Sequence, residues 1–246
     1  MIYTVNSILG DFVINKFISC YLLIFCSACA VSPEQQNIRL LKEASQGKAS
    51  SQYYLGLNYM RGLGVEKDNK RACDLYEKAA NSNYHPAENN LGVCYAKGLG
   101  RELDHKKAFY WYSRAALGGV DVSQNNIGIQ YYDGTGIKQD YKMAIYWFAK
   151  AANLGNVNAQ GNLALMYDDG IGIEQNYKLA CKWYLKAARS GDARSQNNLG
   201  VLYMDGNGVN QDLKKAMFLF QKAAAQGHFK AIANLKKIKK RLDINE

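Results

Sequence analysis

Residues able to do catalytic or metal chemistry are few in this chain, and they are spread along it. The 246 residues include only three histidines, His85, His105 and His228, and no two of them have a spacing that would place both on one face of a helix. A zinc site or a general-base site needs several such side chains in one place. The sequence therefore predicts no metal site, no cofactor and no catalytic residue.

Five Gly-x-Gly pairs are the other feature that could suggest chemistry, because glycine-rich loops can hold phosphate groups. None is followed by Gly-Lys-Ser or Gly-Lys-Thr, and each follows a helical pattern rather than a strand. Glycine also adopts the left-handed conformation that ends a helix. We therefore interpret the pairs as helix ends, at Gly62/Gly64, Gly98/Gly100, Gly134/Gly136, Gly170/Gly172 and Gly206/Gly208.

The glycine pairs belong to a repeat that runs through most of the chain. The pattern Leu-Gly-x-x-Tyr, with small variations, starts every 36 residues without an insertion or deletion. A multi-residue pattern that returns at one fixed spacing is the signature of a repeat architecture. Its five copies are Leu55-Gly56-Tyr59, Leu91-Gly92-Tyr95, Ile127-Gly128-Tyr131, Leu163-Ala164-Tyr167 and Leu199-Gly200-Tyr203.

Each copy predicts two helices. The first ends at the Gly-x-Gly pair, and four residues after the second glycine an Asp or Asn can cap the next helix by accepting hydrogen bonds from its free N–H groups. The second helix carries alanine and aromatic residues at spacings of three and four, which is typical of an amphipathic helix. The unit is a helical hairpin, so the predicted fold is an all-α solenoid of antiparallel helix pairs. The capping residues are Asp68, Asp104, Asp140, Asn176 and Asp212.

These motifs resemble the Sel1-like repeat, a relative of the tetratricopeptide repeat, whose pattern combines Leu-Gly-x-x-Tyr, Gly-x-Gly-Val, Asp-x-x-x-Ala and Trp-Tyr-x-Lys-Ala-Ala-x-x-Gly. The match covers about residues 48–227 and departs from the pattern at Asn83, Arg101, Ala164 and Leu219. The resemblance implies a right-handed superhelix whose first helices line a concave groove. It also implies a protein partner in that groove, in envelope regulation or in interaction with a host.

The 36-residue register continues beyond the five repeats at both ends, since Gly47 and Leu235 fall in its columns. We expect an N-terminal cap helix in residues 31–47, running from Pro33 to Ser45. The five repeats occupy residues 48–227. Residues 228–246 form a C-terminal cap whose polar outer side suits a terminal repeat.

Residues 1–30 are typical of an export signal. The run from Phe17 to Phe25 is mostly apolar, too short to span a bilayer, and followed by small residues. Two processing outcomes fit. Ala28-Cys29-Ala30 matches a cleavage signal, and Cys26-Ser27-Ala28-Cys29 resembles a bacterial lipobox, in which a lipid is attached to Cys29. We favour the lipobox.

Lipidation of Cys29 would attach the protein to a membrane as a periplasmic or envelope lipoprotein, with secretion or surface exposure as further outcomes of export. A cytosolic protein whose start site has been misassigned is the alternative. The segment before Lys16 is long and poorly charged for an export signal, which is why this alternative stays open.

The repeats hold three further cysteines, Cys73, Cys94 and Cys181. Cys73 and Cys181 share a column that otherwise holds apolar residues, so we favour small buried hydrophobic side chains. The alternative is a disulfide between Cys73 and Cys94, because the two are nearly equidistant from the turn between their helices. An exported protein could oxidise such a pair.

Two columns of asparagine in the first helices are the main candidates for partner binding. A carboxamide offers both a donor and an acceptor, so a row at constant pitch could hold an extended peptide backbone. The alternative is that the amides bridge neighbouring helices. The outer column, directly before the Leu-Gly pair, holds Asn90, Asn126, Asn162 and Asn198, and the inner column, one residue earlier, holds Asn89, Asn125 and Asn197.

Two columns after the Leu-Gly pair vary between repeats, as a specificity surface would, although they could equally be solvated helix ends. The first includes Tyr132. The second is basic in the first two repeats and acidic in the last three, so a groove there would bind a ligand of complementary charge in one direction. This second column holds Arg61, Lys97, Asp133, Asp169 and Asp205.

The net charge of +10 is spread over the second helices and the C-terminal cap, which together with export argues against nucleic acid. We interpret the chain as an exported scaffold that binds a protein or extended peptide. The alternative is a penicillin-binding or β-lactamase-like hydrolase, because some cysteine-rich relatives are linked to penicillin binding and Ser45 and Lys48 match Ser-x-x-Lys. Gly47 separates the two where a helix should end, and neither Ser-Asp-Asn nor Lys-Thr-Gly follows, so we interpret this match as accidental.

Overall fold

The computed structural model describes residues 32–242, which form twelve α-helices and no strand. Every helix is thirteen residues long. The helices are α2 (Pro33–Ser45), α3 (Ala49–Arg61), α4 (Asn69–Asn81), α5 (His85–Lys97), α6 (His105–Leu117), α7 (Asp121–Asp133), α8 (Tyr141–Asn153), α9 (Val157–Asp169), α10 (Tyr177–Arg189), α11 (Ala193–Asp205), α12 (Leu213–Ala225) and α13 (Phe229–Arg241).

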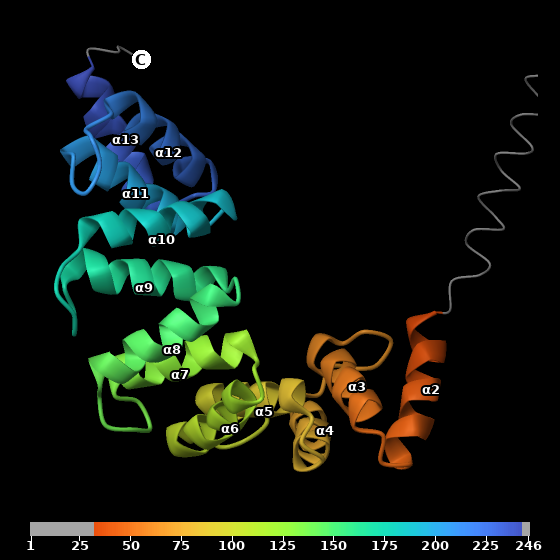
Figure 1. Cartoon of the computed structure of the whole chain (residues 1–246). Helices are drawn as coiled ribbons and strands as arrows, with labels where there is room; N and C mark the ends of the chain where they lie inside the picture. The colour runs from red at the N-terminus through yellow and green to blue at the C-terminus, as the bar shows by residue number, and fades with distance from the viewer. Residues whose placement is uncertain (1–31, 243–246) are drawn as a thin grey trace, which may run out of the picture.

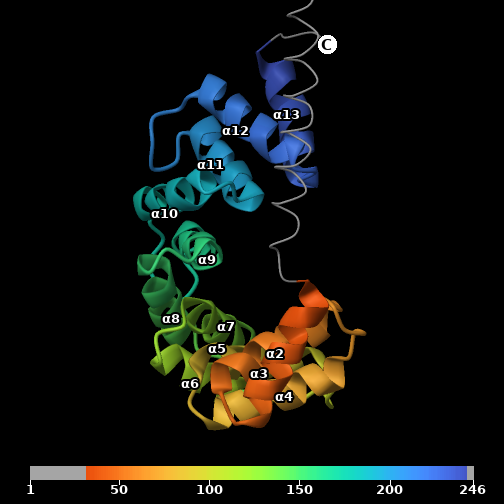
Figure 2. The ribbon, with the colours of Figure 1, turned by 90° about the vertical axis from the view of Figure 1, so that its right-hand side faces the viewer.

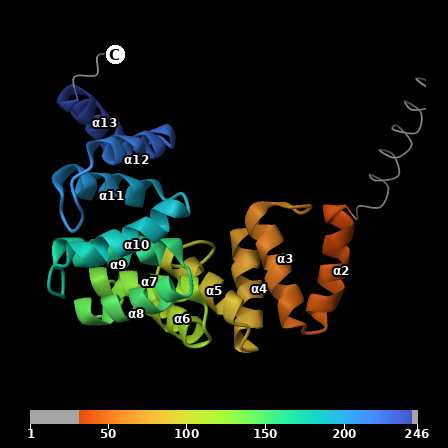
Figure 3. The ribbon, with the colours of Figure 1, turned by 45° about the horizontal axis from the view of Figure 1, so that its top comes forward.

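The helices pair into hairpins that stack along an open arc (Figure 1). Each helix packs against the next one in the chain, so that α3–α4, α5–α6, α7–α8, α9–α10 and α11–α12 form five hairpins between the single helices α2 and α13. Seen from the side, α7 and α9 lie nearer to the open side of the arc than α8 and α10 (Figure 2). Figure 3 shows α2, α3 and α4 side by side at one end. The predicted α/α solenoid is confirmed.

The repeated sequence gives each hairpin the same helix ends. First helices end on a glycine in the left-handed region, with φ 72° at Gly134, for example. Second helices begin at an Asp or Asn whose side chain accepts a hydrogen bond from a backbone N–H, as Asp140 does from Met143. The five predicted caps, Asp68, Asp104, Asp140, Asn176 and Asp212, are all formed.

The glycine of the Leu-Gly motif sets how closely the two helices of a hairpin approach. A Cβ atom added to Gly128 would lie 2.6 Å from Cδ1 and Cε1 of Phe148, which is inside normal van der Waals contact. The absence of a side chain therefore lets the ring pack on the backbone of the first helix. The same contact joins Gly56 to Tyr76, Gly92 to Tyr112 and Gly200 to Phe220.

At each junction in the stack, one repeat position on a helix faces one repeat position on the first helix of the next hairpin. Between α2 and α3, Asn58 Nδ2 donates to Asn37 Oδ1 at 2.7 Å. Between α4 and α5, the equivalent residues Cys73 and Cys94 are joined in a disulfide with their Cα atoms 6.2 Å apart, and both are fully buried. Between α6 and α7 the pair is Phe109 with the buried polar residue Gln130. Further along the stack, Ile145 with Met166, Cys181 with Leu202 and Met217 with Ile238 each share an apolar cluster.

The disulfide is the pairing that the sequence left as the alternative to free buried thiols. Cys181, which lies across from Leu202 rather than from a second cysteine, is a buried free thiol. Burial raises the pKa of the Cys181 thiol to about 11, because the thiolate would lose its hydration.

A single helix lies at each end of the stack, α2 before the first hairpin and α13 after the last. Helix α2 starts and ends at Pro33 and Ser45, and Glu43 ties it to α3 through Ser51 and Lys48. The Ser51 hydroxyl and then the Lys48 and Arg39 cations lower the pKa of Glu43 to about 2. Residues 1–31 and 243–246 lie outside the described part, and with them the export signal and Cys29.

We expect Gly128→Ala to lower the free energy of unfolding by about 1–3 kcal/mol, because the new methyl group overpacks against Phe148. The matched variant is Ala164→Gly, at the one repeat that already has the methyl group. It should lose only about 1 kcal/mol of helix propensity. Urea unfolding followed by circular dichroism measures both, and an increase in stability for Gly128→Ala would contradict the packing argument.

Reduction of the Cys73–Cys94 disulfide should lower the free energy of unfolding by about 3 kcal/mol, since the bond closes a loop with a sequence separation of 21. Urea unfolding with and without a reductant measures the difference. The Cys181→Ala variant is the control and should show the same difference. Free alkylation of both thiols in folded protein taken from its native compartment would count against the bond.

Candidate functional site

One face of the first helices is left open by the neighbouring helices. In α7 it carries Val122, Asn126, Ile129 and Asp133, at the spacing of four, three and four that keeps residues on one side of a helix. Val122 is 45% exposed and Ile129 is 38% exposed. We call this surface the groove face. It consists of Ser50, Tyr54, Leu57, Arg61, Pro86, Asn90, Val93, Lys97, Val122, Asn126, Ile129, Asp133, Asn158, Asn162, Leu165, Asp169, Arg194, Asn198, Val201 and Asp205, none of which is buried.

An apolar row runs along the middle of the groove face. It lies three residues after the outer asparagine column, between the amides and the charged row, and its members are Leu57, Val93, Ile129, Leu165 and Val201. We did not predict this row from the sequence, because apolar residues in a helix are usually assigned to the core. The sequence signal for this row was its spacing, three residues after the outer asparagine and four before the charged residue, which keeps all three on one side of the helix.

The asparagines bridge neighbouring hairpins. Asn126 Nδ2 donates to Asn89 Oδ1 at 3.3 Å, and Asn162 Nδ2 donates to Asn125 Oδ1 at 3.0 Å. In the C-terminal cap, Asn234 Nδ2 donates to Asn197 Oδ1 at 3.0 Å. The inner-column residues Asn125 and Asn197 are buried, whereas the outer column Asn90, Asn126, Asn162 and Asn198 is half-buried and faces the groove.

Each outer amide keeps a second N–H that these bridges do not use, because a carboxamide has two donor hydrogens. Binding of a partner by the outer column therefore stays compatible with its structural role, and it stays a prediction.

The charged row predicted after the Leu-Gly pair lies on the groove face. Arg61 and Lys97 are exposed near one end, and Asp133, Asp169 and Asp205 are exposed toward the other. The neighbouring column that includes Tyr132 is less exposed than the charged row: Met204 is buried, and Met60, Ala96, Tyr132 and Asp168 are half-buried. Burial raises the pKa of Asp168 in that column, and its Oδ2 accepts a hydrogen bond from Tyr184.

Two adjoining hollows lie on α7, α9 and α11. A polar hollow of about 440 Å³ is lined by Asn125, Asn126, Ile129, Asn158, Asn162, Asp192 and Arg194. A more apolar pocket of about 230 Å³ is lined by Ile129, Tyr132, Phe148, Asn162, Leu165, Met166 and Arg194. Because three residues line both, the two hollows form one continuous depression that includes the predicted residues Asn126, Asn162 and Tyr132.

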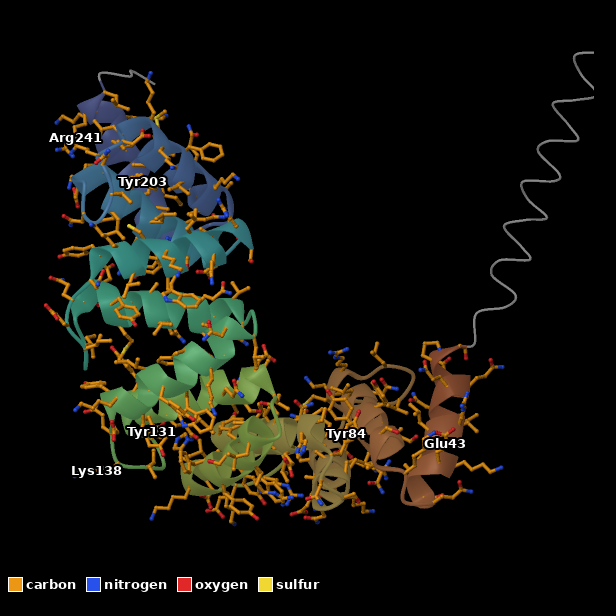
Figure 4. The ribbon with its side chains drawn as sticks, in the orientation of Figure 1. Glu43, Tyr84, Tyr131, Lys138, Tyr203 and Arg241 are labelled. Atoms are coloured by element: carbon orange, nitrogen blue, oxygen red, sulfur yellow. A yellow bond between two sulfur atoms is a disulfide. The ribbon has the colours of Figure 1, made fainter. Side chains whose placement is uncertain are left out.

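Tyrosines replace the asparagine columns in the first repeat. Tyr53 lies with its ring centroid 5.3 Å from those of both Tyr54 and Tyr84, and 6.0 Å from that of Tyr76. Tyr84 is labelled in Figure 4, at the end of the arc that holds the first hairpin. Tyr54 is half exposed on the groove face. This end of the groove is therefore aromatic and basic.

Glu88 is a buried carboxylate in a column that otherwise holds glutamine. The glutamines, such as Gln124, donate from Nε2 to the backbone carbonyl eight residues earlier, at 3.2 Å in this case. A carboxylate cannot donate, and Glu88 instead lies 2.8 Å from the Arg114 guanidinium and 2.9 Å from Nδ1 of His85. The Arg114 contact is a charge contact without hydrogen-bond alignment, since Oε1 of Glu88 has no hydrogen-bond partner among residues 32–242. We assign this group a role in joining α5 to α6.

The side chains of Ser45 and Lys48 contact different partners. Ser45 ends α2 and donates from Oγ to the carbonyl of Lys42, while Lys48 precedes α3 and pairs with Glu43 at 2.9 Å. Gly47 lies between them with φ 86°. Within residues 32–242, no group of three or more His, Cys, Asp and Glu side chains could hold a metal ion, and no helix is long and apolar enough to cross a bilayer.

Comparisons with known proteins agree with this architecture. The chain shares 39% identity with a protective antigen of uropathogenic Escherichia coli strains, with a TM-score of 0.77 over 82% of this chain and 44% of that one. It shares 34% identity with a Sel1 repeat protein of Oxalobacter formigenes, with a TM-score of 0.76 over 81% and 82% of the two chains. Yeast Tom70, at 16% identity and a TM-score of 0.56 over 91% and 47%, shares the fold alone. No curated protein sequence matches the chain.

The family assignment follows from the repeats themselves. The family model described as the Sel1 repeat matches five times in succession, at residues 49–84, 85–120, 121–156, 157–192 and 193–228. These matches span the five hairpins of the structure. The chain belongs to the Sel1 repeat family.

Proposed function

We propose that this protein is an exported scaffold that binds an extended segment of another protein along the groove face. The observation that carries the proposal is the apolar row, which stays accessible between a row of amides and a row of charges. Membership of the Sel1 repeat family supports an interaction scaffold, because stacked hairpins present long preformed surfaces. An apolar strip with flanking polar groups is suited to a chain that alternates apolar and polar side chains.

The amides and the apolar row would contribute together. Each hydrogen bond from an outer asparagine adds about 0.5–1.5 kcal/mol, while micromolar affinity needs about 8 kcal/mol. Apolar contacts with Ile129, Leu165 and the pocket beside them supply the remainder. The change of sign from Lys97 to Asp133 favours one direction of the bound segment, acidic toward the first repeats and basic toward the last.

Export rests on the apolar run in residues 17–25 and on the small residues before Cys29. The E. coli relative is described as a protective antigen of uropathogenic strains, which supports a location in the envelope or facing the host. Since the present chain spans 44% of that relative, the likeness supports the location without carrying over the relative's other properties. A lipid on Cys29 would hold the solenoid at a membrane surface.

Ile129→Lys should weaken peptide binding at least tenfold, because it puts a charge in the middle of the apolar row. The measurement is the binding of purified protein to an array of random 15-residue peptides, followed by titration of the best binders. Tyr146→Lys is the matched control, since Tyr146 is similarly exposed on the second helix α8, away from the groove face. Equal loss in both variants, or no peptide bound by the unchanged protein, would contradict the groove.

When the full chain is produced in a bacterial host, we expect the mature protein to begin at Cys29 and to carry a lipid. Its intact mass should equal that of residues 29–246 plus the lipid. Cys29→Ala should lose the lipid, and it should also lose incorporation of labelled palmitate. Cleavage after Ala30 without a lipid would contradict lipidation but would still agree with export. An unprocessed N-terminus would contradict both.

A further inference from the structure

The apolar pocket on the groove face lies where one position of the repeat changes from tyrosine to phenylalanine. Phe148 occupies this position in the third hairpin, and it lines the pocket. Three of the other four hairpins have a hydroxyl group there. In chain order the position holds Tyr76, Tyr112, Phe148, Tyr184 and Phe220.

The hairpin after the pocket shows what a hydroxyl does at this position. Tyr184 is fully buried, and its hydroxyl accepts from Asn198 Nδ2 at 3.0 Å and donates to Asp168 Oδ2 at 3.2 Å. Asp168 belongs to α9 and Asn198 to α11. The hydroxyl therefore links two successive first helices beside the groove face.

This link is absent between α7 and α9. Phe148 has no hydroxyl, and the residues equivalent to its two partners are Tyr132 and Asn162. Asn162 Nδ2 donates instead to Asn125 Oδ1 at 3.0 Å. Phe148, Tyr132 and Asn162 all line the pocket, so a hydroxyl at position 148 would enter it.

The pocket is open to the groove and large enough for an aromatic ring. Ile129 and Leu165 of the apolar row line it, and Ile129 is 38% exposed. The buried side chains of Phe148 and Met166 line it more deeply. Its volume is about 230 Å³, whereas an apolar cavity of about 150 Å³ already binds benzene. A side chain from a segment in the groove therefore has both room and access.

The lining groups favour an aromatic ring over an aliphatic side chain. The thioether of Met166 makes favourable contacts with ring edges, and the rings of Phe148 and Tyr132 offer edge-to-face packing. The exposed guanidinium of Arg194 borders the pocket and can lie against a ring face. Arg194 is held there because it donates to Asn162 Oδ1 at 2.8 Å.

Two carboxylates border the pocket on the side of the charged row. Asp133 on α7 and Asp169 on α9 each lie one helical turn beyond an apolar residue of the pocket, and both are exposed. Within residues 32–242 neither forms an ion pair. Both are therefore available to a cation of the bound segment.

We propose that this pocket binds the aromatic side chain of a Phe or Tyr in the segment that lies along the groove, with a neighbouring Lys or Arg facing Asp133 and Asp169. The ring lies over Phe148 and Met166 and beneath the Arg194 guanidinium. An acidic neighbour is opposed by the two carboxylates. This inference rests on the proposed function, and it adds which side chains of the partner the groove selects and where.

The test uses small probes, so that it does not depend on an identified partner. Acetyl-Phe-Lys-amide is titrated into ¹⁵N-labelled protein, with acetyl-Leu-Lys-amide and acetyl-Phe-Glu-amide as comparison probes. The first probe should shift the amide signals of Ile129, Leu165 and Met166, with a dissociation constant at least fivefold lower than those of the other two. No localised shift, or equal dissociation constants for the three probes, would overturn the proposal.

One variant closes the pocket with a residue that the fold already uses. Phe148→Tyr should weaken the Phe-Lys probe at least fivefold with little change in melting temperature, because its hydroxyl enters the pocket. Phe220→Tyr is the matched control, since it makes the same change in the last hairpin, away from the pocket, and it should leave the probe's affinity unchanged. Unchanged affinity in a folded Phe148→Tyr variant overturns the proposal.

Substitutions of exposed residues test the same pocket without altering buried groups. Arg194→Gln should weaken the Phe-Lys probe about threefold, because it removes the cation at the rim. The double variant Asp133→Asn/Asp169→Asn should bring the dissociation constants of the Phe-Lys and Phe-Glu probes within twofold of each other. A preference for lysine that survives this double variant overturns the charged half of the recognition.

The outcome for the pocket is separable from that for the wider groove. If random peptides bind and Ile129→Lys releases them, but Phe148→Tyr binds them equally well, the groove stands and the aromatic pocket fails. If no random peptide binds but the Phe-Lys probe selectively shifts Leu165 and Met166, the pocket stands and the extended groove fails.

Discussion

Every hairpin of this protein depends on its neighbours, because two thirteen-residue helices are too few to enclose an apolar core. The contact that holds the stack is the one between a second helix and the next first helix. It is made differently along the chain, by Asn37 with Asn58 at the start, by the Cys73–Cys94 disulfide next, and by apolar pairs from Ile145 with Met166 onward. The same pair of positions in the repeat thus holds a hydrogen bond, a disulfide or an apolar contact, provided that the second helix and the next first helix stay at the same distance from each other.

The distances between helices also set the spacing of the first helices, which carry the groove face. The ring of Phe148 packs on the backbone of Gly128, and the equivalent rings do the same in other hairpins. These contacts keep the first helix of each such hairpin at a similar distance from its second helix. Glutamine and asparagine amides then join successive hairpins across the stack. Because buried polar groups must be paired, these amides make the spacing of the first helices specific rather than merely compact. A groove fixed in this way costs a ligand little rearrangement.

Much of this could be predicted from the sequence, and the remainder could not for identifiable reasons. Helix ends such as Gly134 and Asp140 are decided by local backbone chemistry, so the repeat predicts them within a residue. The apolar row was missed, because Ile129 looks like a core residue unless the covering of each helix face is known. The choice between free thiols and a disulfide at Cys73 depended on the distance between helices of different repeats. The asparagines had two roles that one sequence could not separate, and the structure shows the bridging role.

The departures from the repeat carry the individuality of this groove, because a perfect repeat would present the same surface five times. Tyr53 ends the inner column with an aromatic cluster, beside the basic residues of the first repeats. Gly161 interrupts the same column where the charged row is acidic and where the two hollows adjoin. A segment lying along such a surface meets an aromatic and basic end and a polar, acidic end, and these cannot be exchanged by reversing the chain. If a segment binds along the proposed groove, one direction and one register would follow from the charged row together with these two substitutions in the inner column, while the helices beneath them stay the same.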